Sequence, residues 1–585
     1  MKNGLLQMLL MALLMFCPTC LLAADQLQII VQGVEGEALD NVRLALAVPP
    51  GMVREGRIDV PWLRLFEKEA AEKVASSLQP FGYYNAKIHT SLETPEEGNY
   101  RLEVKIDPGP PVRVGSVAID VLGAGTAEKS LNELAREFPL KTGDVLQQVK
   151  YEDAKSKLRA KAVEIGYLDA AFTTHEILIT KEKNSADIRL VLETGPQYFF
   201  GETGLTEDTG YPERFLRRFL AFKPGDVYTD AKIVETQFNF INSERFRQIF
   251  VIPEKEKTID HRIPVFVRLK PAPRRRVRVG AGYGTDTGPR VSGSYKDLNM
   301  FHLGHELLIE LYIAQRLQGL AGAYTIPSSK NIKSATGLQL NLQREDTVTY
   351  ETRFISAEVN RSRSFGPGIL GTVYLRYLQE DYTIGGEDSS SRLIFPGIRF
   401  SVSRYDNLIR PTKGYRCALE ARGTTEYLGS DTGFVQLLAD ANTIIPLPWR
   451  FSLVTRGAFG ATALEDTFAN LPPSIRFFAG GDNSVRGYSY QSLGPRDSTG
   501  DVVGGKNLLV GSVELQRDIF DKWAVSAFFD TGNAFDSFSD IRLFSSVGVG
   551  IHYYTIVGAL NLYGARQIGV DNPGYRIVFT VGFEL

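Results

Sequence analysis

The feature that most limits the fold of this chain is an alternation of apolar and polar side chains in its second half. From residue 274 onward, segments of about ten residues show this two-residue period. In the segment 433–443, for example, Val435 and Leu437 share one face, whereas Gln436 and Asp440 share the other. Beyond residue 24 the sequence contains no run of about 18 apolar residues that could form a spanning helix.

A closed transmembrane β-barrel is the fold that this alternation predicts. A bilayer accepts strands only when every backbone group is paired, and an antiparallel barrel achieves this. At roughly 20 residues for each strand with its connection, residues 272–585 predict about sixteen strands. The 34 Phe, 25 Tyr and 55 Gly also suit such a barrel. Composition alone leaves a large soluble all-β protein equally open.

The first 24 residues carry the three parts of a secretory signal peptide. Residues 1–3 are positively charged, residues 5–15 are largely apolar, and residues 22–24 form a small-residue cleavage site. We therefore expect residues 1–24 to be removed on export. Cleavage would leave Cys417 as the last cysteine, which excludes an internal disulfide and a cysteine-based zinc site.

An internal repeat of about 80 residues fills the first half of the chain. Two short motifs recur: KTGDV at 141–145 and KPGDV at 223–227; GYYNA at 82–86 and GYLDA at 166–170. Each unit is predicted to run strand, helix, helix, strand, strand, which makes a small α+β domain.

Three such units are predicted, at 25–110, 111–196 and 197–271. The first is the most divergent, because Glu55-Gly56-Arg57 replaces its Gly-Asp motif. Terminal copies of an array often differ because they face a different neighbour. We expect the first unit to be the docking surface for a partner.

Enzyme chemistry has little support in this sequence. His305-Glu306 is followed by Ile309 where a zinc protease helix needs its second histidine. Neither a nucleophile elbow nor a phosphate-binding loop is present. The net charge of −2 gives no reason to expect a nucleic acid partner. We expect a protein that is not an enzyme and that has no cofactor, no metal and no ATP requirement.

One loop motif late in the sequence resembles a known family. RFFAGGDNSVRGY at 476–488 resembles the conserved loop of the BamA-like outer-membrane insertase superfamily, whose tip folds into the barrel lumen. Here the tip is Val485-Arg486-Gly487-Tyr488. Residues 406–414 and 295–299 resemble two further barrel motifs of that superfamily, and the repeats resemble its POTRA domains. The resemblance covers essentially the whole chain after the signal peptide.

Strand parity places two carboxylates in the lumen. Val513 and Leu515 suit the lipid face, so Glu514 points inward; the same argument from Phe529 places Asp530 inward. A guanidinium can bind two carboxylates, so Arg486 on an infolded loop could contact both. We expect this site to be partly hydrated. The alternative is that Arg486 is an ordinary external-loop arginine. In the superfamily the motif has a carboxylate at each of these two strand positions, and both are present here.

The two ends of the barrel are predicted to meet at a weak seam. Gly280, Gly282 and Gly284 lie in the first strand and offer little side-chain packing. A weak seam exposes strand edges with which an incoming strand could pair. The last strand ends in Phe583-Glu584-Leu585, so Phe583 and Leu585 are assigned to the seam; such strands usually end in an aromatic residue.

The resemblance implies a bacterial outer-membrane protein with periplasmic POTRA domains that helps to insert and fold other β-barrel proteins, such as autotransporters. Three POTRA-like units are similar to the TamA family, the translocation and assembly module subunits. That similarity implies a TamB-like partner anchored in the inner membrane and bound through the POTRA domains. Unfolded outer-membrane proteins would be the substrates.

Other functions stay open at this point. One is a secretion pore of the two-partner type, dedicated to one protein substrate. Such transporters usually have a plug helix before the POTRA domains, whereas a strand-like segment begins here at residue 27. Another is a component of envelope phospholipid transfer. A passive porin is disfavoured, because porins lack periplasmic repeats.

Overall fold

The computed structural model describes residues 26–54, 56–96, 98–206, 208–329, 331–407, 410–465, 467–555 and 558–581. The predicted signal peptide, Phe583 and Leu585 lie outside these residues. The chain forms two compact units, and each is described by itself below. The first comprises the residues up to Thr203 with 222–234 and 253–265; the second comprises 204–221, 235–252 and the chain from Phe266.

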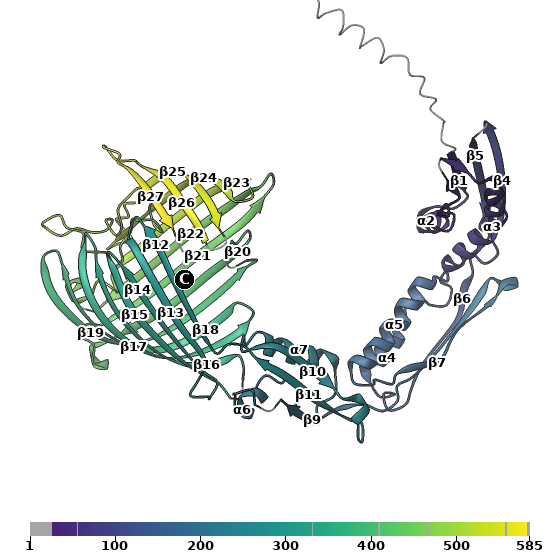
Figure 1. Cartoon of the computed structure of the whole chain (residues 1–585), viewed down its shortest axis with the longest axis horizontal. Helices are drawn as coiled ribbons and strands as arrows, with labels where there is room; N and C mark the ends of the chain where they lie inside the picture. The colour runs from purple at the N-terminus through teal and green to yellow at the C-terminus, as the bar shows by residue number, and fades with distance from the viewer. Residues whose placement is uncertain are drawn as a thin grey trace, which may run out of the picture. The chain divides into compact units, whose positions relative to one another are not determined.

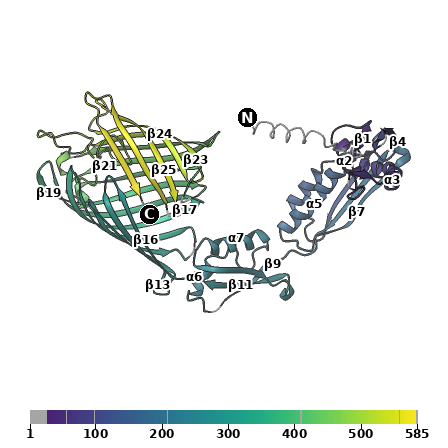
Figure 2. The same cartoon turned by 45° about the horizontal axis from the view of Figure 1, so that its top comes forward.

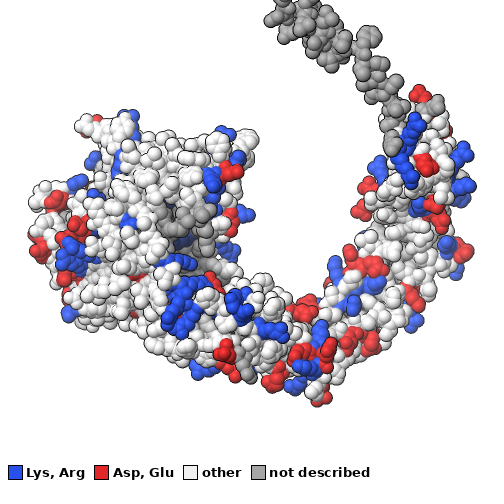
Figure 3. All heavy atoms as spheres, viewed as in Figure 1, with Lys and Arg blue, Asp and Glu red and all other residues white. Residues whose placement is uncertain are grey.

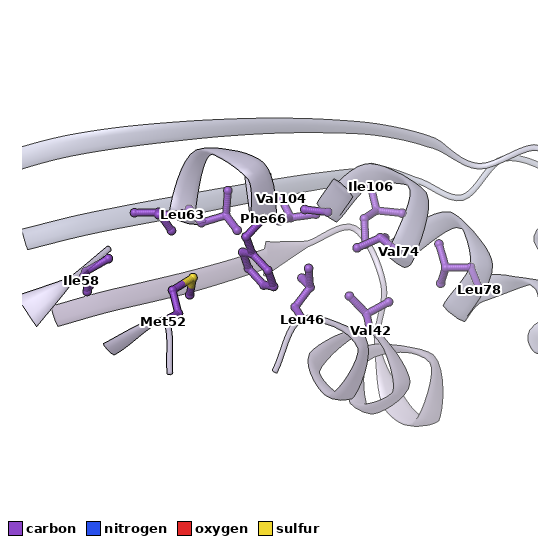
Figure 4. Packing of buried hydrophobic residues seen from close by; sticks show 12 residues of the cluster. Val42, Leu46, Met52, Ile58, Leu63, Phe66, Val74, Leu78, Val104 and Ile106 are labelled. Atoms are coloured by element: carbon purple, nitrogen blue, oxygen red, sulfur yellow. The ribbon is translucent and has the colours of Figure 1, made fainter. Parts of the chain in front are cut away.

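The first module is a small α+β domain with its core between two helices and a sheet. Its main elements are β1 (Gln26–Gln32), α2 (Gly36–Ala45), α3 (Val60–Leu78), β4 (Lys87–Glu96) and β5 (Asn99–Asp107), with the short strands β2 (Val53–Arg54) and β3 (Arg57–Ile58). The sheet order is β1-β5-β4, with β1 parallel to β5. Asp59 starts α3 by accepting a hydrogen bond from the backbone N–H of Trp62. Figure 4 shows Phe66 of α3 packed among Leu46 and Val104 in this core.

The second module repeats this topology. Its elements are β6 (Arg113–Leu122), α4 (Lys129–Arg136), α5 (Gln148–Glu164), β7 (Ala171–Thr180) and β8 (Ser185–Glu193). The sheet order is β6-β8-β7, again with the first strand parallel to the last. The predicted order of strand, helix, helix, strand, strand is therefore present in both modules.

The repeated Gly-Tyr motif joins each module to the next. The carbonyl of Gly82 accepts a hydrogen bond from Val112, and that of Gly166 accepts one from Tyr198, each at 2.8 Å. Both glycines have positive φ, +91° and +95°, which side chains rarely adopt. A Cβ at Gly166 would also lie 2.7 Å from Val227. The motif therefore recurs because this joint needs glycine.

The third predicted module contains β9 (Phe199–Leu205), α6 (Glu213–Arg217), α7 (Asp230–Ile241), β10 (Phe246–Pro253) and β11 (Arg262–Pro271). Its sheet order is β10-β11-β9. The division between the two compact units passes through these residues. The described residues also form the short 3-10 helices η1 (Gln79–Phe81), η2 (Lys181–Lys183), η3 (Lys255–Lys257), η4 (Glu426–Leu428) and η5 (Phe468–Asn470).

The rest of the chain forms a closed antiparallel barrel of sixteen strands, β12 to β27 (Figures 1 and 2). This confirms the predicted fold class and strand number. The strands are β12 (Arg275–Gly284), β13 (Gly288–Met300), β14 (His305–Ala314), β15 (Leu317–Pro327), β16 (Ser334–Asp346), β17 (Tyr350–Gly366), β18 (Ile369–Ile384), β19 (Glu387–Tyr405), β20 (Gly414–Thr424), β21 (Phe434–Leu447), β22 (Phe451–Leu464), β23 (Asn507–Phe520), β24 (Trp523–Phe535), β25 (Phe544–Thr555), β26 (Gly558–Ile568) and β27 (Tyr575–Val581).

The outward face of the barrel is apolar and its inward face is polar. On β21, Val435 is 66% exposed, whereas the neighbouring Gln436 is fully buried. Charged side chains are sparse over the outward surface of the strands in Figure 3 and dense on the N-terminal modules. Such a face suits lipid. Among the described residues, no helix combines the length and the apolar character needed to cross a membrane.

Candidate functional site

The two end strands of the barrel pair over a short stretch. β12 pairs with β13 along its whole length, from Arg275 to Gly284. With β27 it pairs only at Tyr283 and Gly284, within the part of the chain that the structure describes. Every other neighbouring pair of barrel strands has a longer register. Among the described residues, the pairing of β12 with β27 therefore has the fewest ladder hydrogen bonds of the neighbouring strand pairs in the barrel.

Of the three predicted seam glycines, one lies inside this short pairing and two lie outside it. Gly284 is opposite Thr580 of β27, inside the paired stretch. Gly280 and Gly282 lie in the part of β12 that is paired with β13 alone, among the described residues. Directly after β12, the backbone N–H and the hydroxyl of Thr285 each donate a hydrogen bond to the carbonyl of Phe579 in β27, both at 3.2 Å.

A long connection between β22 and β23, residues 465–506, carries the motif that resembled the superfamily loop. It folds into the barrel. Gly480 and Gly481 have φ of +96° and +108°, so only glycine follows this backbone without strain. Ala479 and Leu493 exchange two backbone hydrogen bonds of 2.9 Å and hold the tip as a narrow hairpin. Residues 465–506 are called the inserted loop below.

Arg486 at this tip contacts both carboxylates that strand parity placed in the lumen. Its Nε and Nη2 donate to the two carboxylate oxygens of Asp530, each at 2.8 Å, and Nη1 donates to Glu514 at 2.6 Å. The backbone N–H of Arg486 also donates to Asp530, at 3.1 Å. Ser512 accepts from Nη2 at 3.3 Å and donates to Asp530 at 2.7 Å. These bonds place the inserted loop against the inner wall formed by β23 and β24, as the sequence predicted.

This contact lies in a dry environment. Arg486 and Asp530 are both 0% exposed, and Glu514 is 6% exposed. The expectation of a partly hydrated site is therefore wrong at Arg486, because aromatic rings cover it. The guanidinium carbon lies 3.4 Å from the ring centroid of Phe528 and 4.8 Å from that of Tyr563.

The Arg486 guanidinium stays charged in this setting. Burial alone would lower its pKa, but the hydrogen bonds and negative charges of Asp530 and Glu514 outweigh it and raise the pKa. A buried cation between two carboxylates is costly to disturb, since removing one partner leaves unpaired charge.

The three other residues of the tip are also fixed by the wall. Gly487 donates its N–H to the hydroxyl of Ser546 at 3.1 Å, and a Cβ there would lie 2.6 Å from that side chain. Tyr488 packs edge-on against Phe544 with ring centroids 5.5 Å apart. Val485 is fully buried in the same cluster. Each position of the tip therefore has a steric or polar reason for its residue type.

The inserted loop also binds the opposite side of the lumen, which the sequence did not predict. Glu380 of β18 is fully buried and accepts hydrogen bonds from the backbone and hydroxyl of Ser474. Glu345 of β16 accepts one from the hydroxyl of Tyr490 at 3.0 Å. Parity alone could have placed Glu380 inward, but its partners lie about a hundred residues away in an irregular loop. Through these contacts the loop crosses the lumen from wall to wall.

The described residues contain no cluster of three His, Cys, Asp or Glu side chains suited to a metal ion. At the tip, the residues that the structure brings together are a structural ion-pair network, one guanidinium held by two carboxylates and a hydroxyl.

Comparison with known families supports each part of this architecture. A family model for the Omp85 superfamily domain matches residues 299–584. A model for POTRA domain TamA domain 1 matches residues 28–108, and a POTRA model described as a surface antigen variable number repeat matches residues 113–195.

Two curated relatives of this chain are named outer membrane protein assembly factors. The chain is 22% identical over 526 residues to the outer membrane protein assembly factor BamA of Nitratidesulfovibrio vulgaris, covering 86% of this chain and 65% of that protein. It is 24% identical over 426 residues to BamA of Neorickettsia risticii, covering 65% of this chain and 54% of that protein. The chain thus spans less than two thirds of the length of these curated relatives.

Solved structures show the same fold. BamA from Haemophilus ducreyi lacking POTRA domains 1–3 matches with a TM-score of 0.63 at 16% identity, over 80% of this chain and 99% of that one. CdiB from Escherichia coli matches with a TM-score of 0.50 at 14% identity, over 81% and 91%. With the family matches, the closed sixteen-stranded barrel and its inserted loop, these similarities show that the chain belongs to the Omp85 superfamily, as an outer-membrane β-barrel with periplasmic POTRA domains.

Proposed function

We propose that this protein inserts and folds other β-barrel proteins in the outer membrane, and that it does so at the seam between β12 and β27. The observation that carries the proposal is the short pairing of these strands, at Tyr283 and Gly284. The relatives named assembly factors support the same class of activity. No reaction catalysed by the chain's own side chains is part of this proposal.

An edge strand in contact with lipid is a template for another strand. Residues 275–282 of β12, on the POTRA side of Tyr283, pair with β13 but with no described residue of β27. On its outward face, Val277 is 70% exposed and Val279 is 83% exposed. An unfolded substrate strand would pair with the edge of β12 by β-augmentation, so that its backbone groups are hydrogen-bonded when it enters the bilayer. No ATP is needed, because ladder formation supplies the driving force.

Within this class we propose a TamA-like role, with autotransporters among the substrates. Three predicted POTRA modules and the match of residues 28–108 to the TamA-type first POTRA domain support it. The partner would be a TamB-like protein anchored in the inner membrane. We assign its docking to the first module, because this module diverges most from the repeat and its strands β1 and β4 form the free edges of a sheet.

A secretion pore of the two-partner type is the second candidate, favoured by the fold shared with CdiB. In this chain the inserted loop contacts Glu380 and Glu345 on one wall and Asp530 on the other. Export of a chain through the lumen would require all these buried contacts to break. Assembly at the seam leaves the contacts to Glu380 and Glu345 in place, so we favour assembly.

Site-specific cross-linking distinguishes the two functions. A photo-reactive residue at Val279 on β12 should form adducts with a newly exported outer-membrane barrel protein. The matched control is Val435 on β21, which is also exposed on the outward face but lies in a strand paired on both sides. Adducts at position 279 and none at 435 are expected. Equal yields at both positions, or adducts only from lumen positions, would contradict assembly at the seam.

A further inference from the structure

Three charged side chains from distant segments meet at one end of the seam. Asp286 lies in the turn between β12 and β13, Arg576 in β27, and Asp482 in the inserted loop. Arg576 Nη2 donates to Asp286 at 2.6 Å and lies 3.0 Å from Asp482. The side chains are 10%, 14% and 8% exposed for Asp286, Arg576 and Asp482. One guanidinium thus connects the first hairpin, the last strand and the loop.

The backbone of the inserted loop is shaped to meet Asp286. The N–H of Asp482 donates to the Asp286 carboxylate at 2.6 Å. At the preceding position, a Cβ on Gly481 would lie only 2.6 Å from the same carboxylate. Any larger residue would push the loop away from the turn. This close approach is independent of the Arg576 ion pairs and points to the same junction.

Arg576 also links the seam to the buried tip of the loop. Its Nη1 donates to the backbone carbonyl of Arg486 at 3.1 Å, while Nη2 holds Asp286. Two further arginines border the cluster: Arg316 donates to the carbonyl of Asp286 at 3.4 Å, and Arg290 to that of Val581 at 3.3 Å. Displacement of the tip and separation of β12 from β27 would therefore disturb the same side chain.

Arg576 binds its two carboxylate partners, Asp286 and Asp482, unequally. Two carboxylates share one guanidinium, and the Asp482 oxygen near Arg576 makes no hydrogen bond. Burial, and then the charge of Asp286, raises the pKa of Asp482 to about 6. Asp482 is thus held less tightly than Asp286 is.

We infer that Asp286, Asp482 and Arg576 form a latch that closes the outer end of the seam and ties its opening to movement of the inserted loop. The strand pairing at Tyr283 and Gly284 lies beside this latch, far from the POTRA end of β12. The latch thus fastens the end of the seam that lies away from the POTRA modules. The role of the latch rests on the proposed function. In that function a substrate strand would enter from the periplasmic end of the seam and release the latch last.

The latch is tested by the rate at which a cysteine pair across the seam forms a disulfide. Gly284→Cys and Thr580→Cys occupy opposed positions at a spacing that a disulfide can bridge. They are introduced into the full chain with Cys417→Ser and studied in lipid nanodiscs. Arg576→Gln and Asp286→Asn should each slow disulfide formation by about fivefold or more, the scale of a partly buried ion pair. Heat-modifiable migration on gels shows that each variant has folded.

The matched control is Arg392→Gln, which removes an exposed arginine of β19 that forms an ion pair with Asp431, away from the seam and from the tip of the inserted loop. It should leave the rate unchanged. The charge reversal Asp286→Arg with Arg576→Asp should restore most of the rate lost in either single reversal. Rates in Arg576→Gln and Asp286→Asn equal to the control, or no recovery in the double reversal, would overturn the latch.

The same measurement separates the latch from the proposed function. Disulfide formation needs no substrate, so a failed latch says nothing against assembly at the seam. If the rates change as expected but substrate folding is independent of every seam variant, the latch stands and the assembly role is wrong. Should Arg576→Gln not fold, Asp286→Asn, which keeps the size of the side chain, carries the same prediction.

Discussion

Removing the Arg486 side chain should free the tip of the inserted loop while the barrel still inserts. Arg486→Ala leaves Asp530 and Glu514, which are 0% and 6% exposed, without their cation. Breaking a fully buried ion pair costs about 3–5 kcal/mol, and the burial of both partners places this site in that range. About 4 kcal/mol corresponds to roughly a thousandfold shift in the equilibrium between the bound and released loop.

Hydrogen exchange measures this equilibrium directly. In the wild type the N–H groups of Arg486 and Gly487 are bonded to Asp530 and Ser546, so peptides covering the tip should be strongly protected. In Arg486→Ala they should exchange at least about a hundredfold faster, allowing for partial collapse of the site. The matched control is Arg496→Ala, because Arg496 is an exposed arginine of the same loop whose side chain donates to the carbonyl of Gly500.

A charge exchange refines this test. Arg486→Glu combined with Asp530→Arg should protect the tip better than either single change. Protection in Arg486→Ala that equals the control, or a double variant no better than the worse single variant, would refute the role given to this ion pair.

Three further predictions follow from the architecture. Limited proteolysis should cut near residues 110, 196 and 271 and leave a heat-modifiable barrel; a protease-digestible C-terminal half would contradict the barrel in the native protein. Deleting residues 25–110 should abolish co-purification with a TamB-like partner while the barrel still assembles, and retained binding would move the contact elsewhere. The pKa of Asp482, raised from 3.8 to about 6, means that the closed loop binds more protons than the released loop between these values. The free energy that favours the closed loop should therefore fall as pH rises from about 4 to 6. Hydrogen exchange at the tip, corrected for the intrinsic exchange rates, should become faster over this range, and Asp482→Asn should abolish this pH dependence.

The alternation of side chains made the barrel predictable, because strand parity is a local property. Val435 and Gln436 lie on the faces that their positions indicated. The same parity brought Glu514 and Asp530 into the lumen, and the motif resemblance supplied Arg486 as their partner. Fold and ion pair thus needed only local periodicity and one motif.

The remaining contacts could not be predicted in this way. Asp286, Asp482 and Arg576 meet because the barrel closes and a loop without periodicity turns back onto the seam. Strand parity can place the side chain of Arg576 on the inward face of β27, but no local feature of the sequence identifies the residues that it contacts. The dryness of the Arg486 site was missed for a similar reason, since Phe528 and Tyr563 cover it from two different strands.

The central claim is that substrates fold at the seam between β12 and β27. It is tested most directly by the folding rate of an outer-membrane barrel protein in liposomes that contain the Gly284→Cys, Thr580→Cys variant with Cys417→Ser. The account predicts faster substrate folding than in empty liposomes when the disulfide is reduced, loss of this acceleration when it is oxidised, and recovery on reduction. Equal acceleration in the oxidised and reduced states would contradict it.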